Sequence, residues 1–154
     1  MRKINPEYVS KVSALTNVCP YFQLLNMRLV HFDMGSSKIE IILDPGKHFQ
    51  PFGNVHGGVY SSIIDAGAFW AVYGQVDENV GMTSVDLKLN YLSATNGSRL
   101  IANGKKIKLG KTLGYGQVEV TDETGKILAH GTSTLMIIPD LTFQFEEPLP
   151  KKFL

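Results

Sequence analysis

Residues 53–67 read GNVHGGVYSSIIDAG, in which two adjacent glycines precede a long apolar run. From Gly57 to Tyr73 the spacing of apolar residues predicts a helix. The apolar positions cover most of the circumference of this helix: Val59, Ile63, Ile64, Ala66, Ala68, Trp70, Ala71, Val72 and Tyr73. Because a helix that is apolar on nearly all sides must be covered by the rest of the chain, we expect it in the centre of the domain.

The start of this predicted helix and one residue inside it carry polar chemistry. The first N–H groups of a helix have no partner within it, so Gly57 and Gly58 leave donors open to an incoming oxygen atom, as in an oxyanion hole. Asp65 lies eight residues after Gly57, among apolar neighbours, where a carboxylate is costly unless it is paired or used. We therefore expect both places to belong to a site.

The spacing of His56 and Asp65 bears on how such a site is assembled. Nine residues separate them, which is about 13 Å along a helix axis and two and a half turns, so they lie on opposite faces. If both serve one site, two chains must contribute. We predict a homodimer in which Asp65 of one subunit faces the His56-Gly57 helix start of the other.

The segments on either side of the helix predict strands. Residues 24–43 alternate in polarity around a turn at 34–37, and residues 44–55 are expected to form a loop. Strand-like runs follow the helix at 83–92, 100–109, 112–120 and 126–138, with turn residues between them. This order predicts an α+β domain in which an antiparallel sheet wraps a central helix, with the last four strands as a meander.

The ends of the chain frame this domain. Asn5-Pro6-Glu7 is typical of a helix start, and Cys19-Pro20 ends that helix. We divide the chain into an N-terminal covering helix and lead-in (1–22), the main domain (23–139) and a tail (140–154) that is expected to be partly extended and poorly packed.

The strand at 83–92 alternates in polarity. Val85, Leu87, Leu89 and Tyr91 alternate with Ser84, Asp86, Lys88 and Asn90. One face is therefore expected on the core and the other in solvent. We also expect this strand to pair edge to edge with its copy in a dimer and to form one continuous sheet.

Composition limits the classes of partner. The chain has 154 residues, 44% of them hydrophobic, and a formal net charge of +1, which disfavours nucleic acid as a partner. Cys19 is the only cysteine, and the four histidines are too scattered for a metal site. We expect a cytoplasmic protein with no signal peptide, no membrane span and no cofactor.

Several short motifs, taken together, resemble a known family. They are His56-Gly57-Gly58, Asp65, the runs 83–87 and 90–92, Gly110-Lys111-Thr112, and the closing runs 118–120, 125–129 and 131–134. In this order and spacing, over 50–138, the chain resembles the hotdog-fold acyl-CoA thioesterases of the PaaI-like, aspartate-dependent group. The resemblance implies a hotdog fold and hydrolysis of acyl-CoA to free acid and CoA, with CoA as part of the substrate.

The same resemblance implies roles for individual residues. Asp65 would be the general base or the nucleophile, and the Gly57 N–H would polarise the thioester carbonyl. His56 would orient the helix start, Gln50 would place an amide near the carbonyl or water, and Ser84 would position water or Asp65. Each of these residues also has a purely structural interpretation. Asp65 would be a buried carboxylate and His56 a helix-capping residue. The glycines would permit close packing, Ser84 would be an ordinary sheet residue, and Gln50 would be a loop amide.

The resemblance extends to the CoA portion and to assembly. Basic residues of the later strands would meet the CoA phosphates: Arg99, Lys105, Lys106, Lys108 and Lys111. The chain departs from many relatives at Leu92-Ser93-Ala94-Thr95, where they carry an Arg-Pro or Ser-Pro pair. Dimers of this kind often form tetramers. Aromatic residues beside Asp65, Phe69 and Trp70 among them, would line an acyl pocket in addition to their place in the core.

Two other functions fit the same pattern. One is hydration or dehydration of an acyl thioester, which needs a histidine and a carboxylate converging on one carbon. The other is a non-catalytic acyl-CoA-binding or sensing module. The sequence contains no DNA-binding segment that would report such binding, so hydrolysis is the leading hypothesis.

Overall fold

The computed structural model describes residues 2–154. Their helices and strands, in chain order, are α1 (Pro6–Asn17), α2 (Pro20–Leu24), β1 (Met27–Phe32), β2 (Ser36–Ile42), α3 (Pro45–His48), α4 (Gly57–Tyr73), β3 (Val80–Tyr91), β4 (Arg99–Leu109), β5 (Leu113–Thr121) and β6 (Ile127–Pro139). The strands form one six-stranded antiparallel sheet in the order β1-β2-β4-β5-β6-β3. The predicted α+β class is confirmed.

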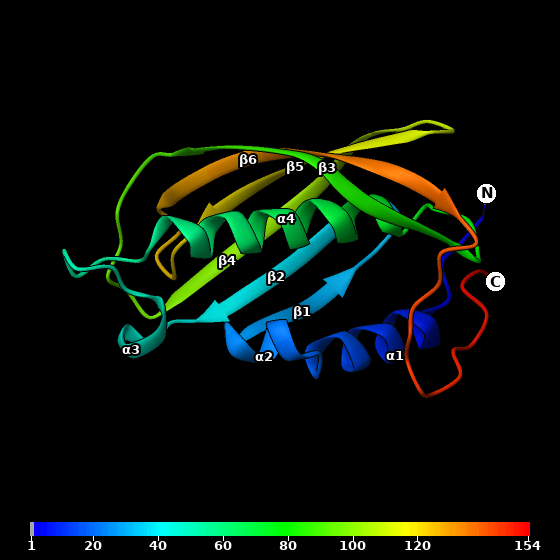
Figure 1. The fold of residues 1–154 in the computed structure, drawn as a ribbon, viewed down its shortest axis with the longest axis horizontal. Helices are drawn as coiled ribbons and strands as arrows, with labels where there is room; N and C mark the ends of the chain where they lie inside the picture. The colour runs from blue at the N-terminus through cyan, green and yellow to red at the C-terminus, as the bar shows by residue number, and fades with distance from the viewer. Residues whose placement is uncertain (1) are drawn as a thin grey trace.

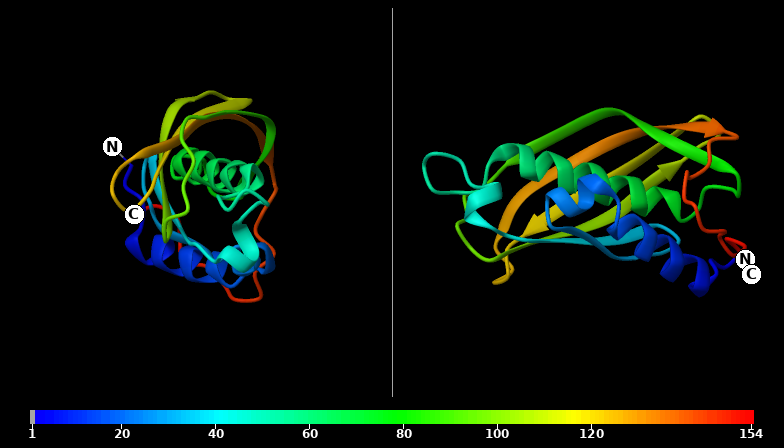
Figure 2. Two further views of the ribbon diagram at one scale, coloured as in Figure 1. Left: turned by 90° about the vertical axis from the view of Figure 1, so that its left-hand side faces the viewer. Right: turned by 60° about the horizontal axis from the view of Figure 1, so that its bottom comes forward.

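The sheet curls around α4, which has the bounds that the sequence predicts (Figures 1 and 2). Ile63, Ile64 and Val72 have no exposed surface, as expected for a helix covered on most sides. Helix and sheet come so close that a Cβ on Gly104 of β4 would lie 2.4 Å from the carbonyl oxygen of Gly67. Because glycine has no side chain, β4 lets α4 lie directly on the sheet at this point.

The order of the strands corrects one prediction. β4, β5 and β6 form a meander, but β3 pairs with β6 at the sheet edge instead of with β4. After β3 the N–H groups of Leu92 and Ser93 donate to Leu128 of β6, and the chain then crosses to β4. The turn residues at 95–98 therefore lie in a crossover, because glycine and asparagine permit a bend without fixing which strands it joins.

Two short helices lie where the sequence predicts none. Pro20 ends the first helix as expected, but it also occupies the first turn of α2. Asp44 caps α3 by accepting from the Gly46 N–H at 2.8 Å, inside the predicted loop. No helix within residues 2–154 has the length and apolar character needed to cross a lipid bilayer.

The C-terminal tail is irregular and most of its residues are exposed, but several of its side chains pack on the domain. Phe143 stacks on Trp70 of α4 with ring centroids 5.9 Å apart. At its end the tail returns to the N-terminus, where Ile4 bridges to Phe153 (Figure 1). The Lys152 side chain is 1% exposed, and its Nζ donates to the carbonyl oxygens of Tyr73 and Val76 at the end of α4. The tail thus caps the central helix.

Lys152 makes the free energy of unfolding depend on pH. Burial, with the nearby Arg2 charge, lowers the pKa of this side chain to about 7 from 10.5, against the opposing pull of Asp77 and Glu78. A neutral amine still has two N–H groups for the two carbonyls. Above pH 7 the unfolded chain binds a proton that the folded chain lacks, so stability rises with pH up to about 10.5.

We expect the free energy of unfolding to rise by about 1 kcal/mol per pH unit between pH 7.5 and 9. Urea unfolding of the wild type and of Lys152→Met at the two pH values measures this. The variant should lose the rise, because it has no amine to titrate. An equal rise in both proteins would contradict the assignment to Lys152.

Candidate active site

The start of α4 presents an open backbone donor. His56 is the N-cap, and its Nδ1 accepts from the Gly58 N–H at 2.8 Å. The Val59 N–H donates to the His56 carbonyl. The Gly57 N–H donates to no acceptor within residues 2–154. The capping role considered for His56 is thus observed, and it holds the loop so that the helix start presents the Gly57 donor.

Two tyrosines pack against this helix start. Tyr91 of β3 donates from its hydroxyl to the Gly57 carbonyl oxygen at 3.3 Å, and its ring meets Tyr60 edge on at 6.0 Å. Burial and the Asp122 charge raise the pKa of Tyr60 to about 12, so this ring stays neutral. A Cβ on Gly57 would lie 2.9 Å from the Tyr91 hydroxyl. Glycine at this position therefore lets Tyr91 lie over the backbone.

Asp65 is oriented by a serine on the neighbouring strand. Ser84 Oγ donates to Asp65 Oδ1 at 2.6 Å. Simple alternation places Ser84 on the polar face of β3, but a bulge at Val85 shifts the register between Ser84 and Asp86. Ser84 and Leu87 therefore pair with the inward residues Leu135 and Ser133 and share the face toward α4.

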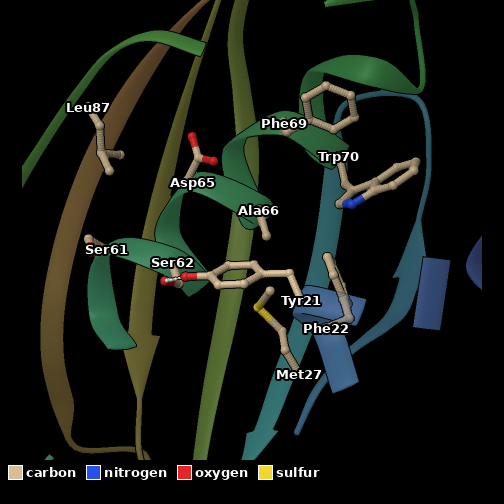
Figure 3. Close-up of a pocket in the computed structure, with 10 residues that line it drawn as sticks. All are labelled: Tyr21, Phe22, Met27, Ser61, Ser62, Asp65, Ala66, Phe69, Trp70 and Leu87. Atoms are coloured by element: carbon tan, nitrogen blue, oxygen red, sulfur yellow. Dashed lines mark hydrogen bonds between the residues drawn. The ribbon is translucent and has the colours of Figure 1, made fainter. Parts of the chain in front are cut away.

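A cavity of about 440 Å³ opens beside Asp65 (Figure 3). It lies between α4, α2, the start of β1 and β3. The residues that line it are Tyr21, Phe22, Met27, Ser61, Ser62, Asp65, Ala66, Phe69, Trp70 and Leu87. Most of this surface is apolar or aromatic, and Phe69 and Trp70 line it as expected, so the arrangement suits an apolar group whose reactive end lies at the carboxylate.

A single chain does not bring the two parts of the predicted site together. His56, Gly57 and Gln50 are absent from the lining of the Asp65 cavity. The Gln50 side chain turns back into its own loop, where its Oε1 accepts from the Phe52 N–H. Asp65 and the His56-Gly57 helix start are thus separated along α4, as the spacing of these residues in the sequence predicts.

The edge strand β3 leaves apolar surface uncovered. It has only one paired neighbour, β6, within residues 2–154. Val85 and Tyr91 are 53% and 59% exposed, so the face predicted to lie on the core is not closed by this chain alone. An exposed apolar edge of this kind is available for pairing with another strand.

The basic residues assigned to CoA are not gathered in one place. Arg99 begins β4, with its Nη1 3.8 Å from a carboxylate oxygen of Glu40, whereas Lys108 is near the far end, about 30 Å away along the strand. Lys106 Nζ donates to Gln75 Oε1 at 2.6 Å. Lys105, Lys108 and Lys111 are exposed. Residues 2–154 contain no group of three or more His, Cys, Asp and Glu placed to hold a metal ion.

Comparison with known proteins assigns the chain to a family. The family model described as Thioesterase superfamily matches residues 52–129, about half of the chain, and the chain belongs to this superfamily. The segment that carries His56, Gly57, Asp65 and Ser84 lies within this match.

Two relatives have names that state an activity. A 1,4-dihydroxy-2-naphthoyl-CoA hydrolase of Listeria monocytogenes is 22% identical over 115 residues, covering 75% of this chain and 93% of that protein. Acyl-coenzyme A thioesterase 13 of Mus musculus is 30% identical over 90 residues, covering 57% of this chain and 64% of that protein. These relatives support thioester hydrolysis as the general activity of the chain.

Solved structures share the fold. Thioesterase HI1161 from Haemophilus influenzae superposes with a TM-score of 0.80 at 20% identity, covering 94% of this chain and 100% of that one. The E. coli PaaI protein superposes with a TM-score of 0.75 at 16% identity, covering 84% and 91%. The sheet wrapped around α4 is therefore the hotdog fold, as predicted, and the PaaI-like grouping fits these neighbours.

Proposed function

We propose that the protein hydrolyses acyl-CoA thioesters to a free carboxylic acid and CoA. The observation that carries the proposal is the Asp65 carboxylate, held by Ser84 at the wall of an apolar cavity. Membership of the thioesterase superfamily and the CoA esters named in two relatives support the choice of substrate.

In this reaction a carbon–oxygen bond forms at the thioester carbonyl and the carbon–sulfur bond breaks, and the departing CoA sulfur takes up the proton that the water loses. Asp65 either takes the proton from the attacking water or adds to the carbonyl itself, forming an anhydride that water then hydrolyses. Both routes need a free carboxylate oxygen. Ser84 hydrogen-bonds Oδ1, while Oδ2 accepts no hydrogen bond from residues 2–154.

We further propose that the site is completed by a second copy of the chain. Pairing of two β3 edges would cover Val85 and Tyr91 and extend the sheet across a homodimer. The open Gly57 N–H of one subunit would then stabilise the carbonyl oxygen of a thioester attacked at Asp65 of the other. His56 would hold this helix start, and Gln50 would turn toward the carbonyl or water.

Assembly beyond the dimer and the position of CoA are also proposals. A tetramer of two such dimers follows from the resemblance alone. Because Arg99 and Lys108 lie at opposite ends of β4, one chain offers them to different parts of CoA or to different ligands. Lys106, Lys108 and Lys111 lie closer to one another in sequence, and we propose these three as the residues that bind the CoA phosphates.

The proposal is tested by release of free thiol from a panel of acyl-CoAs, from acetyl to palmitoyl with phenylacetyl and benzoyl. We expect turnover of one or more members, with kcat of at least about 1 s⁻¹ for the preferred ester. A protein that binds the esters without hydrolysing any would instead be an acyl-CoA-binding module, and the assignment of Asp65 would fail.

A further inference from the structure

The short helix α2 contributes to the Asp65 cavity although it lies outside the family match. That match begins at residue 52, whereas α2 covers Pro20–Leu24. Tyr21 and Phe22 nevertheless line the cavity opposite Asp65 and Trp70 (Figure 3). The wall on this side is thus supplied by the segment that precedes the sheet.

A chain of hydrogen bonds fixes the Tyr21 ring. Tyr21 Oη and Ser62 Oγ are 2.6 Å apart, and Ser62 Oγ is 3.0 Å from the Gly58 carbonyl oxygen, which can only accept. Because the serine hydroxyl has one hydrogen and gives it to Gly58, Tyr21 must be the donor to Ser62. The tyrosine is therefore tied to α4 one turn before Asp65.

Packing holds the other aromatic residue of α2. Phe22 is partly buried and packs against the main hydrophobic core. Tyr21, in contrast, is 54% exposed, so its position depends on the bond to Ser62 rather than on burial. Together the two rings form one wall of the cavity, in which a hydrogen bond holds Tyr21 and packing holds Phe22.

We propose that α2 forms the end of the acyl pocket, and that Tyr21 and Phe22 limit the size of the acyl group that the site accepts. The inference rests on the proposed function. An acyl group whose carbonyl lies at Asp65 enters a cavity bounded by these two rings, and it cannot extend past them without displacing aromatic side chains. A smaller residue at either position lengthens the pocket.

The test compares Tyr21→Ala, Phe22→Ala and Tyr21→Phe with the wild type over saturated acyl-CoAs from butyryl to palmitoyl. Leu24→Ala is the matched control, because Leu24 lies in the same helix but is exposed and outside the cavity lining. We expect the alanine variants to raise the ratio of kcat/KM for the longest ester to that for the shortest by about 10-fold or more. Leu24→Ala should retain the wild-type profile, whereas Tyr21→Phe, which keeps the ring but loses the bond to Ser62, should shift the profile in the same direction as Tyr21→Ala by a smaller factor.

Folded Tyr21→Ala and Phe22→Ala proteins with the wild-type profile would overturn the inference while leaving the proposed function intact. Absence of thiol release by the wild type would overturn the proposed function. Dissociation constants for the same esters, measured in an Asp65→Asn background, then decide the inference without turnover. Circular dichroism and thermal unfolding verify that each variant is folded.

Discussion

We expect Asp65→Asn to lower kcat for acyl-CoA hydrolysis by about 10²- to 10⁴-fold, with little change in the dissociation constant for the ester. Asparagine keeps the shape of the side chain and can still accept from Ser84. It cannot take a proton from water or add to a carbonyl as a carboxylate does. Thiol release and binding to the same ester, measured on the same preparation, separate the two effects.

The matched control for this prediction is Asp86→Asn. Asp86 is on β3, two residues after Ser84, but the bulge at Val85 leaves it exposed and on the outward face. It should retain wild-type turnover. Wild-type kcat in Asp65→Asn would show that the carboxylate is structural.

Gly57→Pro removes the open N–H at the start of α4, and we expect it to lower kcat by about 10²- to 10³-fold. Proline is well tolerated at the first position of a helix, since its missing N–H has no partner there. The preceding residue, His56, has φ −65° and ψ 140°, which is compatible with a following proline. The Tyr91 hydroxyl, which would lie 2.9 Å from a Cβ at residue 57, must shift slightly to admit the ring.

Gly57→Ala separates loss of the donor from the added bulk. Alanine places a Cβ against the Tyr91 hydroxyl. Because it keeps the N–H, this variant should retain most of the wild-type kcat. If alanine and proline lower kcat equally, the space at Gly57 matters and the N–H does not contribute to catalysis.

The central helix could be predicted from the sequence because all its determinants are local. The two glycines, the histidine cap and the nearly continuous apolar surface fix α4 from Gly57 to Tyr73. Asp65 stands out for the same reason, since it is a carboxylate in an apolar helix. These features need no knowledge of which strands are neighbours.

The position of β3 and the packing of the tail could not be predicted in this way, because both depend on contacts distant in sequence. The residues at 95–98 permit a turn but do not show that β3 pairs with β6. The bulge at Val85 reverses the facing of Ser84 relative to simple alternation. In the tail, burial of Lys152 depends on the carbonyl oxygens at the end of α4, which sequence alone does not place nearby.

Only part of the candidate site could be predicted from the sequence, for a related reason. Tyr21 and Phe22 belong to a five-residue helix with no periodic signal, and their contact with Ser62 joins segments 41 residues apart. Gln50 and His56 lie outside the lining of the Asp65 cavity in this chain, and only the proposed dimer would bring them to it.

The central claim, a hydrolytic site shared by two chains, is tested most directly by mixing two inactive variants. Asp65→Asn and Gly57→Pro are co-expressed, and thiol release is measured on the mixed protein. If each site takes Asp65 from one subunit and Gly57 from the other, half of randomly paired dimers carry one intact site, and about a quarter of wild-type activity returns. Activity no higher than that of the separate variants would contradict the shared site.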